Sequence, residues 1–226
     1  MTINLENAKK NAVMNTFKKV VDNTGNRPVL GCINFSKDGN MVATNSHVLL
    51  KIEGTHKPTK HDLLFNLSQG VPMGDVNYPN TDRVIPDNSE NTVTIKSDSF
   101  PVLILWLKAL GKKELVSISM NDKNELVFTC DNNPAINFSI GNNDIYMEKH
   151  DSDEVSVKGL EYTGKLDKLN ILCNAHYLLW GLQLYRDIKA SYITFGFGSD
   201  QETINLRPLT MISEQFTYVV TPRRRY

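Results

Sequence analysis

Histidine and carboxylate side chains are the groups in this sequence that could do acid–base or metal chemistry. His56 and His61 lie in a polar stretch without an acidic or thiol neighbour at the spacing of metal ligands. The acidic cluster at 151–154 falls in a predicted turn, where charged residues are typical of a solvated loop. The sequence also lacks the phosphate-binding P-loop, zinc-protease and nucleophile-elbow patterns. We therefore expect no enzyme, no metal site and no cofactor.

The cysteines are the other reactive side chains. Cys32, Cys130 and Cys173 are odd in number, widely spaced and surrounded by apolar neighbours. This pattern excludes a C-x-x-C metal or redox motif and argues against a disulfide framework. Buried free thiols in a reducing cytoplasm are the expectation.

Length and composition are those of a globular protein. The 226 residues are enough for one large domain or two small ones, and 40% of them are hydrophobic. Lys plus Arg and Asp plus Glu both number 25, so only a local basic face could attract nucleic acid. The first 22 residues carry charges without an apolar core, which predicts no signal peptide. No apolar run approaches the length of a membrane span.

The elements that must position any site begin with a helix. Residues 6–22 have helical period, with Val13, Phe17, Val20 and Val21 on one face. Strands are expected before it at 2–5 and after it at 28–36, 40–44 and 47–53, with a tight turn at 37–40 because Asp-Gly allows positive φ. The first unit is therefore β-α-β-β-β. Residues 55–86 are punctuated by Pro and Gly, with a short helix predicted at 62–67.

The same order of elements returns twice. The second unit comprises a strand at 92–95, a helix at 101–110 capped by Asp98 or Ser99, and strands at 115–120, 125–130 and 136–140. The third comprises strands at 154–163 and 168–172, a helix at 175–187 capped by Asn174, and strands at 192–197, 203–208 and 216–221. Three copies of one topology indicate an α+β fold with an internal structural repeat.

Three separated segments carry a resemblance to a known family. Residues 43–50 (ATNSHVLL), 78–86 (YPNTDRVIP) and 218–226 (YVVTPRRRY) each resemble a stretch of the bacterial DNA polymerase III β sliding clamp, in the family's order. The repeated unit is similar to that of the clamp domain, in which sheets lie outside and helices on the inner face. By this resemblance residues 87–226 form one complete clamp domain, and residues 1–86 form a shortened domain before it.

The resemblance implies a peptide-binding pocket between the two domains. In the family this pocket is an apolar hollow with a few polar rim groups, which binds short tails of polymerases and other DNA-handling proteins. The implied residues are Leu30, Thr44, Ser46, His47, Leu49, Pro79, Arg83, Val84, Val219, Val220, Thr221, Pro222 and Arg223.

The chain departs from the family pattern at the pocket. Val48 stands where the family usually has Arg, Ser46 where it has Gly, and Thr221 where it has Met. The basic tail 223–226 suggests a preference for different, acidic peptides. Taken one at a time, the segments have plainer interpretations: a structural hairpin histidine at His47, or a solvated tail at the C-terminus.

The resemblance also implies contact with DNA. Family clamps line their hole with basic residues of the inner helices, which touch phosphates and read no sequence. The corresponding candidates are Lys9, Lys10, Lys18, Lys19, Lys108, Lys112, Lys113, Arg186 and Lys189. The helices at 101–110 and 175–187 are apolar almost all round, which is typical of burial against another surface.

Three functions stay open at this point. The first is a small, phage-type sliding clamp that closes into a homo-oligomeric ring, a trimer by domain count, around double-stranded DNA and tethers a polymerase. The second is a clamp-fold adaptor or decoy that binds clamp-binding peptides without encircling DNA. The third, an enzyme on an α+β fold, has no motif to support it. All three are expected in the cytoplasm and away from membranes.

Overall fold

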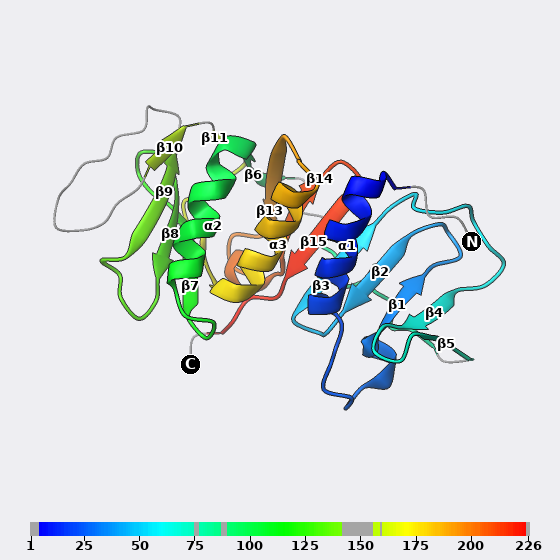
Figure 1. Ribbon diagram of the computed structural model, residues 1–226. Coiled ribbons are helices and arrows are strands. Elements are labelled where there is room, and N and C mark those ends of the chain that lie inside the picture. Colours follow the sequence, from blue (N-terminus) through cyan, green and yellow to red (C-terminus); the bar gives the residue numbers. More distant parts are fainter. Residues whose placement is uncertain (1–4, 75–76, 87–89, 142–155, 159, 225–226) are drawn as a thin grey trace.

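The fold is a pair of sheets backed by helices. The computed structural model describes residues 5–74, 77–86, 90–141, 156–158 and 160–224 (Figure 1). In that part of the chain the α-helices are α1 (Asn7–Val20), α2 (Phe100–Ala109) and α3 (Ala175–Asp187). Short 3-10 turns lie at Pro28–Gly31, Ser97–Ser99 and Ile204–Leu206.

The larger sheet has ten strands and runs the length of the molecule. Its spatial order is β11 (Leu160–Thr163), β6 (Asn91–Lys96), β13 (Tyr192–Phe197), β14 (Leu209–Ser213), β15 (Phe216–Val220), β3 (Val48–Ile52), β2 (Met41–Thr44), β1 (Cys32–Phe35), β4 (Leu63–Asn66) and β5 (Val71–Met73). Neighbouring strands are antiparallel throughout this sheet.

The smaller sheet has five strands. Its order is β10 (Ser156–Lys158), β9 (Asn137–Gly141), β8 (Leu126–Cys130), β7 (Leu115–Met120) and β12 (Asn170–Asn174), with β10 parallel to β9 and the other pairs antiparallel. The first strands of two repeats are exchanged between the sheets. β6 precedes α2 yet pairs with β13, whereas β12 precedes α3 yet pairs with β7. Each sheet therefore needs both repeats to form.

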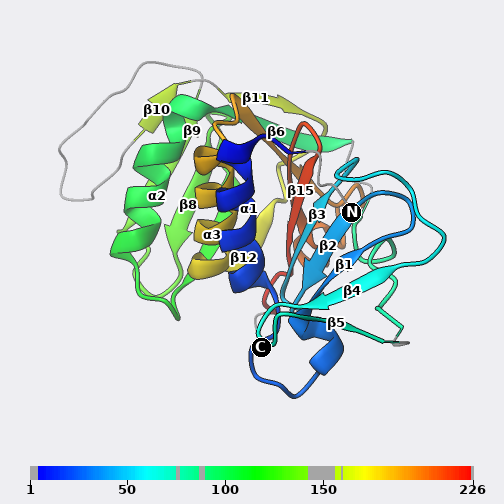
Figure 2. The same cartoon turned by 45° about the vertical axis from the view of Figure 1, so that its right-hand side comes forward.

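The helices cover one side of the sheets. In Figures 1 and 2 the helices α2, α3 and α1 lie side by side in that order, and α3 contacts both of the others. The predicted apolar face of α1 is confirmed, since Val13, Phe17, Val20 and Val21 are at most 3% exposed. The Asn174 side chain caps α3 as predicted by accepting from the His176 and Tyr177 amides. The expected arrangement, repeated units with helices inside and sheets outside, is confirmed.

The prediction of a helix at 62–67 is wrong, because Leu63–Asn66 forms strand β4. A run of four apolar-rich residues does not distinguish a helix from a buried strand. Pairing decides the outcome, since β4 satisfies the free edge of β1 from Cys32↔Asn66 to Phe35↔Leu63. The Asn66 side chain then ends the strand by accepting from the Ser68 and Gln69 amides, both at 3.0 Å.

Strand β4 has the position of a first strand. It pairs with β1 as β12 pairs with β7, that is, with the strand that follows the helix of the preceding repeat. A helix and three more strands would follow in a complete repeat, but the short strand β5 follows instead. We therefore call α1 with β1–β5 the shortened half, and α2, α3 and β6–β15 the complete half. The exact domain boundary at residue 86 stays a prediction.

Two other expectations need correction. Residues 28–31 form a 3-10 turn that begins at Pro28, so the strand expected at 28–36 starts only at Cys32. The strand expected at 203–208 begins at Leu209, because Asp200 holds Glu202 and Thr203 in a turn and Pro208 has no N–H for a strand ladder. The strand predicted at 2–5 lies largely outside the described residues. The single strand expected at 154–163 is wrong, because its described residues form two strands, β10 (Ser156–Lys158) in the smaller sheet and β11 (Leu160–Thr163) in the larger one.

Candidate functional site

The two halves meet at the centre of the large sheet, where β15, the last strand of the complete half, lies beside β3 of the shortened half. Strand β15 pairs with β3 from Phe216↔Ile52 to Val220↔Val48. Beyond the strand, the Thr221 amide donates to the His47 carbonyl at 2.9 Å, and the Arg223 amide donates to the Leu172 carbonyl at 2.7 Å. These backbone bonds fix the C-terminal segment between the β2–β3 hairpin and strand β12 (Asn170–Asn174), and we call the junction of β15 and its tail with the hairpin the seam.

A hollow of about 520 Å³ opens at the seam. It is lined by Arg27, Val29, Leu30, Thr44, Ser46, Val48, Leu49, Pro79, Thr81, Val84, Pro208, Val219 and Thr221. Most of these side chains are aliphatic or proline, and no carboxylate is among them. We call it the apolar hollow, and its chemistry suits a large hydrophobic side chain of a ligand.

The β2–β3 turn shapes one wall of the apolar hollow. The Asn45 side chain accepts from the His47 and Val48 amides, each at 3.0 Å, and Ser46 takes a φ of +76°. The Thr44 hydroxyl donates to the Val48 carbonyl at 2.7 Å. Asparagine suits this place because its side chain replaces missing backbone bonds in tight turns. The turn thereby holds Ser46 at the rim.

The segment 77–86, which we call the connector, forms the opposite wall. The Thr44 amide donates to the Tyr78 hydroxyl at 3.1 Å, and burial raises the pKa of Tyr78 so that it stays neutral. Ile85 packs on the outer side of the sheet, against the cluster of Val42, Leu49 and Val219. Both ends of the connector are therefore held against the sheet.

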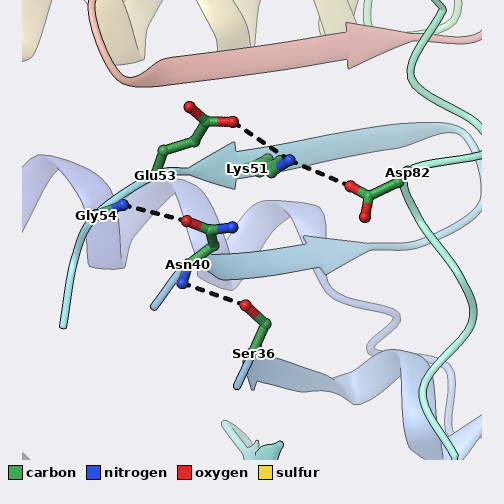
Figure 3. A network of polar contacts seen from close by, with 6 residues as sticks. All are labelled: Ser36, Asn40, Lys51, Glu53, Gly54 and Asp82. Carbon is green, nitrogen blue, oxygen red and sulfur yellow. Dashed lines mark hydrogen bonds and ion pairs between the residues drawn. The ribbon is translucent and has the colours of Figure 1, made fainter. Parts of the chain in front are cut away.

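A polar network ties the middle of the connector to β3. Figure 3 shows Lys51 between Asp82 of the connector, at 3.1 Å, and Glu53, at 3.3 Å. Partial burial opposes the charge of Lys51, but the two carboxylates outweigh it and raise its pKa. In the same view the Asn40 side chain accepts from the Gly54 amide, which closes the other end of the hairpin.

A second hollow of about 490 Å³ adjoins the first and is more polar. We call it the polar hollow; it is lined by Val21, Asp22, Asn23, Thr24, Asn26, Arg27, Asn45, Ser46, His47 and Tyr177. Arg27 and Ser46 line both hollows, and the Arg27 guanidinium donates to the Ser46 hydroxyl at 3.0 Å. The His47 ring stacks on Tyr177 with centroids 5.8 Å apart. The two hollows thus share one rim.

The structure brings most of the expected pocket residues together. Those that line the apolar hollow are Leu30, Thr44, Ser46, Leu49, Pro79, Val84, Val219 and Thr221. His47 lines the polar hollow instead, and Val220 is fully buried in the main core. Arg83, Pro222 and Arg223 follow or precede lining residues without lining the hollow themselves; Arg83 and Arg223 are exposed.

Several lining residues were not expected from the sequence. Arg27 and Val29 come from the turn before β1, and Pro208 comes from the loop before β14. Thr81 lies within the resembling segment 78–86 and could have been included. Val48, noted as a departure from the family pattern, is an aliphatic part of the wall. No local pattern points to Pro208.

The expected DNA-contacting cations are spread over the helical side. Lys19 donates to Gln183 of α3 at 3.0 Å. Burial lowers the pKa of Lys19, against the attraction of Asp187 and with the repulsion of Arg186 and Lys108. Charged groups of all three helices therefore meet around Lys19. Lys9 lies 3.6 Å from a carboxylate oxygen of Glu214, and Arg186 lies 2.7 Å from one of Asp187.

The remaining cations of that set vary in surroundings. Lys18, Lys108, Lys112, Lys113 and Lys189 are exposed, and Lys10 is half-buried. Apolar side chains interrupt the same side, since Leu105 of α2 is 68% exposed and Val102 is 36% exposed. The helical side is consequently a mixture of basic and apolar surface.

His56 and the cysteines, which were considered for acid–base or metal chemistry, are packed inside the structure. His56 is buried, with its ring nitrogens near the Lys57 and Asn40 carbonyls at 2.9 and 3.3 Å. Cys32, Cys130 and Cys173 are free and buried, as expected. Across the described ranges no three His, Cys, Asp or Glu side chains gather as a metal site would require. The described helices include none with the length and hydrophobicity to cross a bilayer.

Comparisons with known proteins match the fold but not the sequence. No protein-family model and no curated protein matches the chain. Solved structures do match. The DNA polymerase III β subunit of Borrelia burgdorferi aligns with a TM-score of 0.70 at 15% identity, over 98% of this chain and 64% of that one.

Two other solved clamps agree. The Pseudomonas aeruginosa sliding clamp aligns with a TM-score of 0.68 at 16% identity, over 100% of this chain and 66% of that one. The Streptococcus pneumoniae DNA polymerase III β chain has a TM-score of 0.63 at 19% identity, over 100% and 65%. The chain thus spans just under two thirds of the clamp chains that it matches. Its fold is that of the DNA polymerase III β sliding clamp.

Proposed function

We propose that this chain is a non-catalytic, clamp-like accessory protein of DNA replication that docks short peptide segments of its partners in the apolar hollow. The observation that carries the proposal is the hollow itself. Segments far apart in sequence (27–30, 44–49, 79–84 and 219–221) converge on one apolar cavity at the seam of a clamp fold. An apolar cavity with a polar rim suits an extended peptide with one or two hydrophobic anchors.

Val84 offers a direct test of this docking. It lines the hollow yet is 50% exposed, so its replacement changes the hollow without disturbing the core. We expect Val84→Glu to weaken binding of a labelled, amidated ten-residue peptide with adjacent Leu and Phe by about tenfold or more, because a charge enters an apolar cavity. Fluorescence anisotropy measures the affinity.

Val71→Glu is the matched control, because Val71 is 46% exposed and lies in edge strand β5, outside the hollow. It is expected to bind the peptide like the parent. Equal binding by Val84→Glu and the parent, with both proteins folded by circular dichroism, would remove the hollow from the proposal.

We further propose that the helical side faces double-stranded DNA and contacts its phosphates in an oligomeric ring. Support comes from Lys108 of α2 and Arg186 of α3, whose charges act on Lys19 of α1. Such contacts are sequence-independent and salt-sensitive. The combined Lys18→Ala and Lys19→Ala variant should lower the salt slope of DNA binding by about two, at about 0.9 per phosphate contact.

The charge-matched control for that experiment is Lys37→Ala with Lys60→Ala, both exposed in loops of the shortened half. Light scattering with and without duplex DNA gives the oligomeric state. Retention on nicked circular DNA that is lost on linearisation would establish a closed ring. Failure to retain either form would favour the second candidate.

That second candidate is an adaptor or decoy that binds clamp-binding peptides without encircling DNA. It is favoured by Leu105 of α2, whose side chain is 68% exposed. The first candidate would turn this helix toward the phosphates. A large exposed apolar side chain gains nothing from a phosphate backbone. A monomer that binds the peptide but shows no salt-dependent DNA binding is the outcome expected for this function.

A further inference from the structure

Arginine and lysine have different places in this molecule. The arginines are Arg27, Arg83, Arg186, Arg207, Arg223, Arg224 and Arg225, whereas the other basic residues are lysines. Arg27 lines the apolar hollow, Arg83 precedes the lining residue Val84, and Arg223 follows Thr221 by two positions. Most of the lysines expected to contact DNA lie on or beside the helices instead. Three of the seven arginines, Arg27, Arg83 and Arg223, thus belong to segments that line the hollow.

Among the described residues, the carboxylates Asp22, Asp82 and Glu53 near the hollow have partners. Asp82 of the connector is bound to Lys51, which also holds Glu53. Asp22 accepts from the Thr24 amide at 2.9 Å and the Thr24 hydroxyl at 2.7 Å, and these bonds lower its pKa. Arg27 lies close enough to Asp22 to add to that effect.

The rim arginines Arg83 and Arg223 are exposed, and in the described part of the chain no ion pair joins either of them to a carboxylate. The backbone holds Arg223 in place, since its amide donates to the Leu172 carbonyl. A guanidinium presents a planar fork of donors that matches a carboxylate, and it is more weakly hydrated than an ammonium group. Arg27 thus lines the hollow, and Arg83 and Arg223 are exposed cations on the segments that form its walls.

We infer that the segment bound by the apolar hollow carries Asp or Glu side chains on both sides of its hydrophobic anchor, which the rim arginines bind. This inference rests on the proposed docking function and adds the chemistry of the partner. Val84, Leu49 and Val219 would hold the anchor, while Arg83 on the connector side and Arg223 on the tail side would hold the flanking carboxylates.

The test compares three ten-residue peptides that share the same Leu-Phe core and differ in their flanking residues or in the group at the C-terminus. One has Asp and Glu flanks and an amidated end, one has Asn and Gln flanks and an amidated end, and one has the neutral flanks with a free terminal carboxylate. We expect the acidic peptide to bind about tenfold more tightly than the amidated neutral one in low salt. The difference should shrink in 0.5 M salt. At roughly that concentration the screening length is about 3–5 Å, so exposed charges attract each other only at contact.

The combined Arg83→Gln and Arg223→Gln variant should lose most of that preference, about tenfold for the acidic peptide, and keep its affinity for the neutral one. The combined Lys60→Gln and Lys123→Gln variant removes the same charge from exposed loops away from the hollow and is expected to behave like the parent. Circular dichroism verifies that both variants are folded.

The outcomes separate this inference from the docking function. Equal binding of the acidic and amidated neutral peptides overturns the inference and leaves the docking function standing. Binding of neither peptide overturns the docking function. Two further outcomes also overturn the inference. If the free terminal carboxylate alone gives the preference, the arginines bind a chain end. If a 20-base-pair duplex displaces the acidic peptide, the arginines bind DNA.

Discussion

The two halves of this molecule are built from the same unit and closed in different ways. In the complete half, two helices lie over two sheets that exchange their first strands. In the shortened half, α1 alone lies over β1–β5, and β4 is the last element with a place in the repeat. The core of the shortened half is thus covered by one helix, whereas that of the complete half is covered by two.

The shortened half compensates by using its neighbour. Helix α1 packs on α3, and β3 pairs with β15, so both of its layers continue into the complete half. Val13 and Phe17 of α1 belong to the same core cluster as Tyr218 of β15 and Leu178 of α3. We expect the dependence to run one way, because the exchanged strands join the two sheets of the complete half to each other.

The mutation with the largest expected effect tests this one-way dependence. Phe17→Ala empties a fully buried position on α1 and should cost about 3–5 kcal/mol, with the loss confined to the shortened half. Phe128→Ala empties an equally buried position on β8 and should lower the protection of both halves. Hydrogen exchange resolved by peptide mass spectrometry separates the two patterns.

If Phe17→Ala lowered protection uniformly from β1 to β15, the halves would unfold together. The two halves would then differ in topology but not in stability. A folded complete half in the Phe17→Ala protein would also show that it tolerates the loss of its neighbour.

A smaller effect is expected where α3 crosses the seam. Gly181 faces Tyr218, and a Cβ at this position would lie 2.7 Å from the tyrosine ring and 3.0 Å from the Met211 sulfur. Alanine gains about 1 kcal/mol of helix propensity, but contacts this short put the overpacking cost in the upper part of its usual range, at about 2–3 kcal/mol. We expect Gly181→Ala to lower Tm by roughly 2–8 °C for a net loss of about 1–2 kcal/mol.

Differential scanning calorimetry measures that shift. A variant as stable as the parent would mean that α3 moves away from the sheet at little cost. Widening of the apolar hollow would then be expected, since β15 forms one of its walls.

The smallest effect concerns pH at the contact between α3 and α1. Burial, together with Lys112 and Lys19, lowers the pKa of His176 below 6.5. The unfolded chain then binds the proton more readily than the folded one, so this contribution is present above pH 6.5 and is lost as pH falls through the folded pKa. We expect parent stability to fall slightly more than that of His176→Gln between pH 8 and 5.5.

Urea midpoints at the two pH values provide the measurement, with His61→Gln as a control because His61 is exposed in a loop. Identical pH dependence of parent and His176→Gln would contradict the assignment.

Local patterns predicted the helices well and the irregular connections poorly. The helix at 175–187 was predicted residue for residue, because its cap and apolar period are both local signals. Strand β4 was predicted as a helix because its identity depends on the unpaired edge of β1, which is some thirty residues away. The late start of β14 likewise depends on the turn held by Asp200.

The candidate site divides in the same way. Leu49, Val84 and Val219 were placed together from three matching segments, and the seam brings them to one hollow. Val220 was placed with them, but strand alternation directs it into the core while Val219 faces the hollow. Pro208 was missed because a loop residue reaches a site through tertiary packing and leaves no spacing to detect.

The continuous backbone across the seam has a consequence for partner exchange. Opening the hollow by rotation of one half against the other would tear the ladder from Phe216↔Ile52 to Val220↔Val48. Under the proposed docking function, a ligand would therefore meet a receptor of nearly constant shape and would need no closure step after collision. Arrival should follow the ordinary rates for rigid docking, about 10⁵–10⁷ M⁻¹s⁻¹, and competition among partners should be decided by how long each one stays.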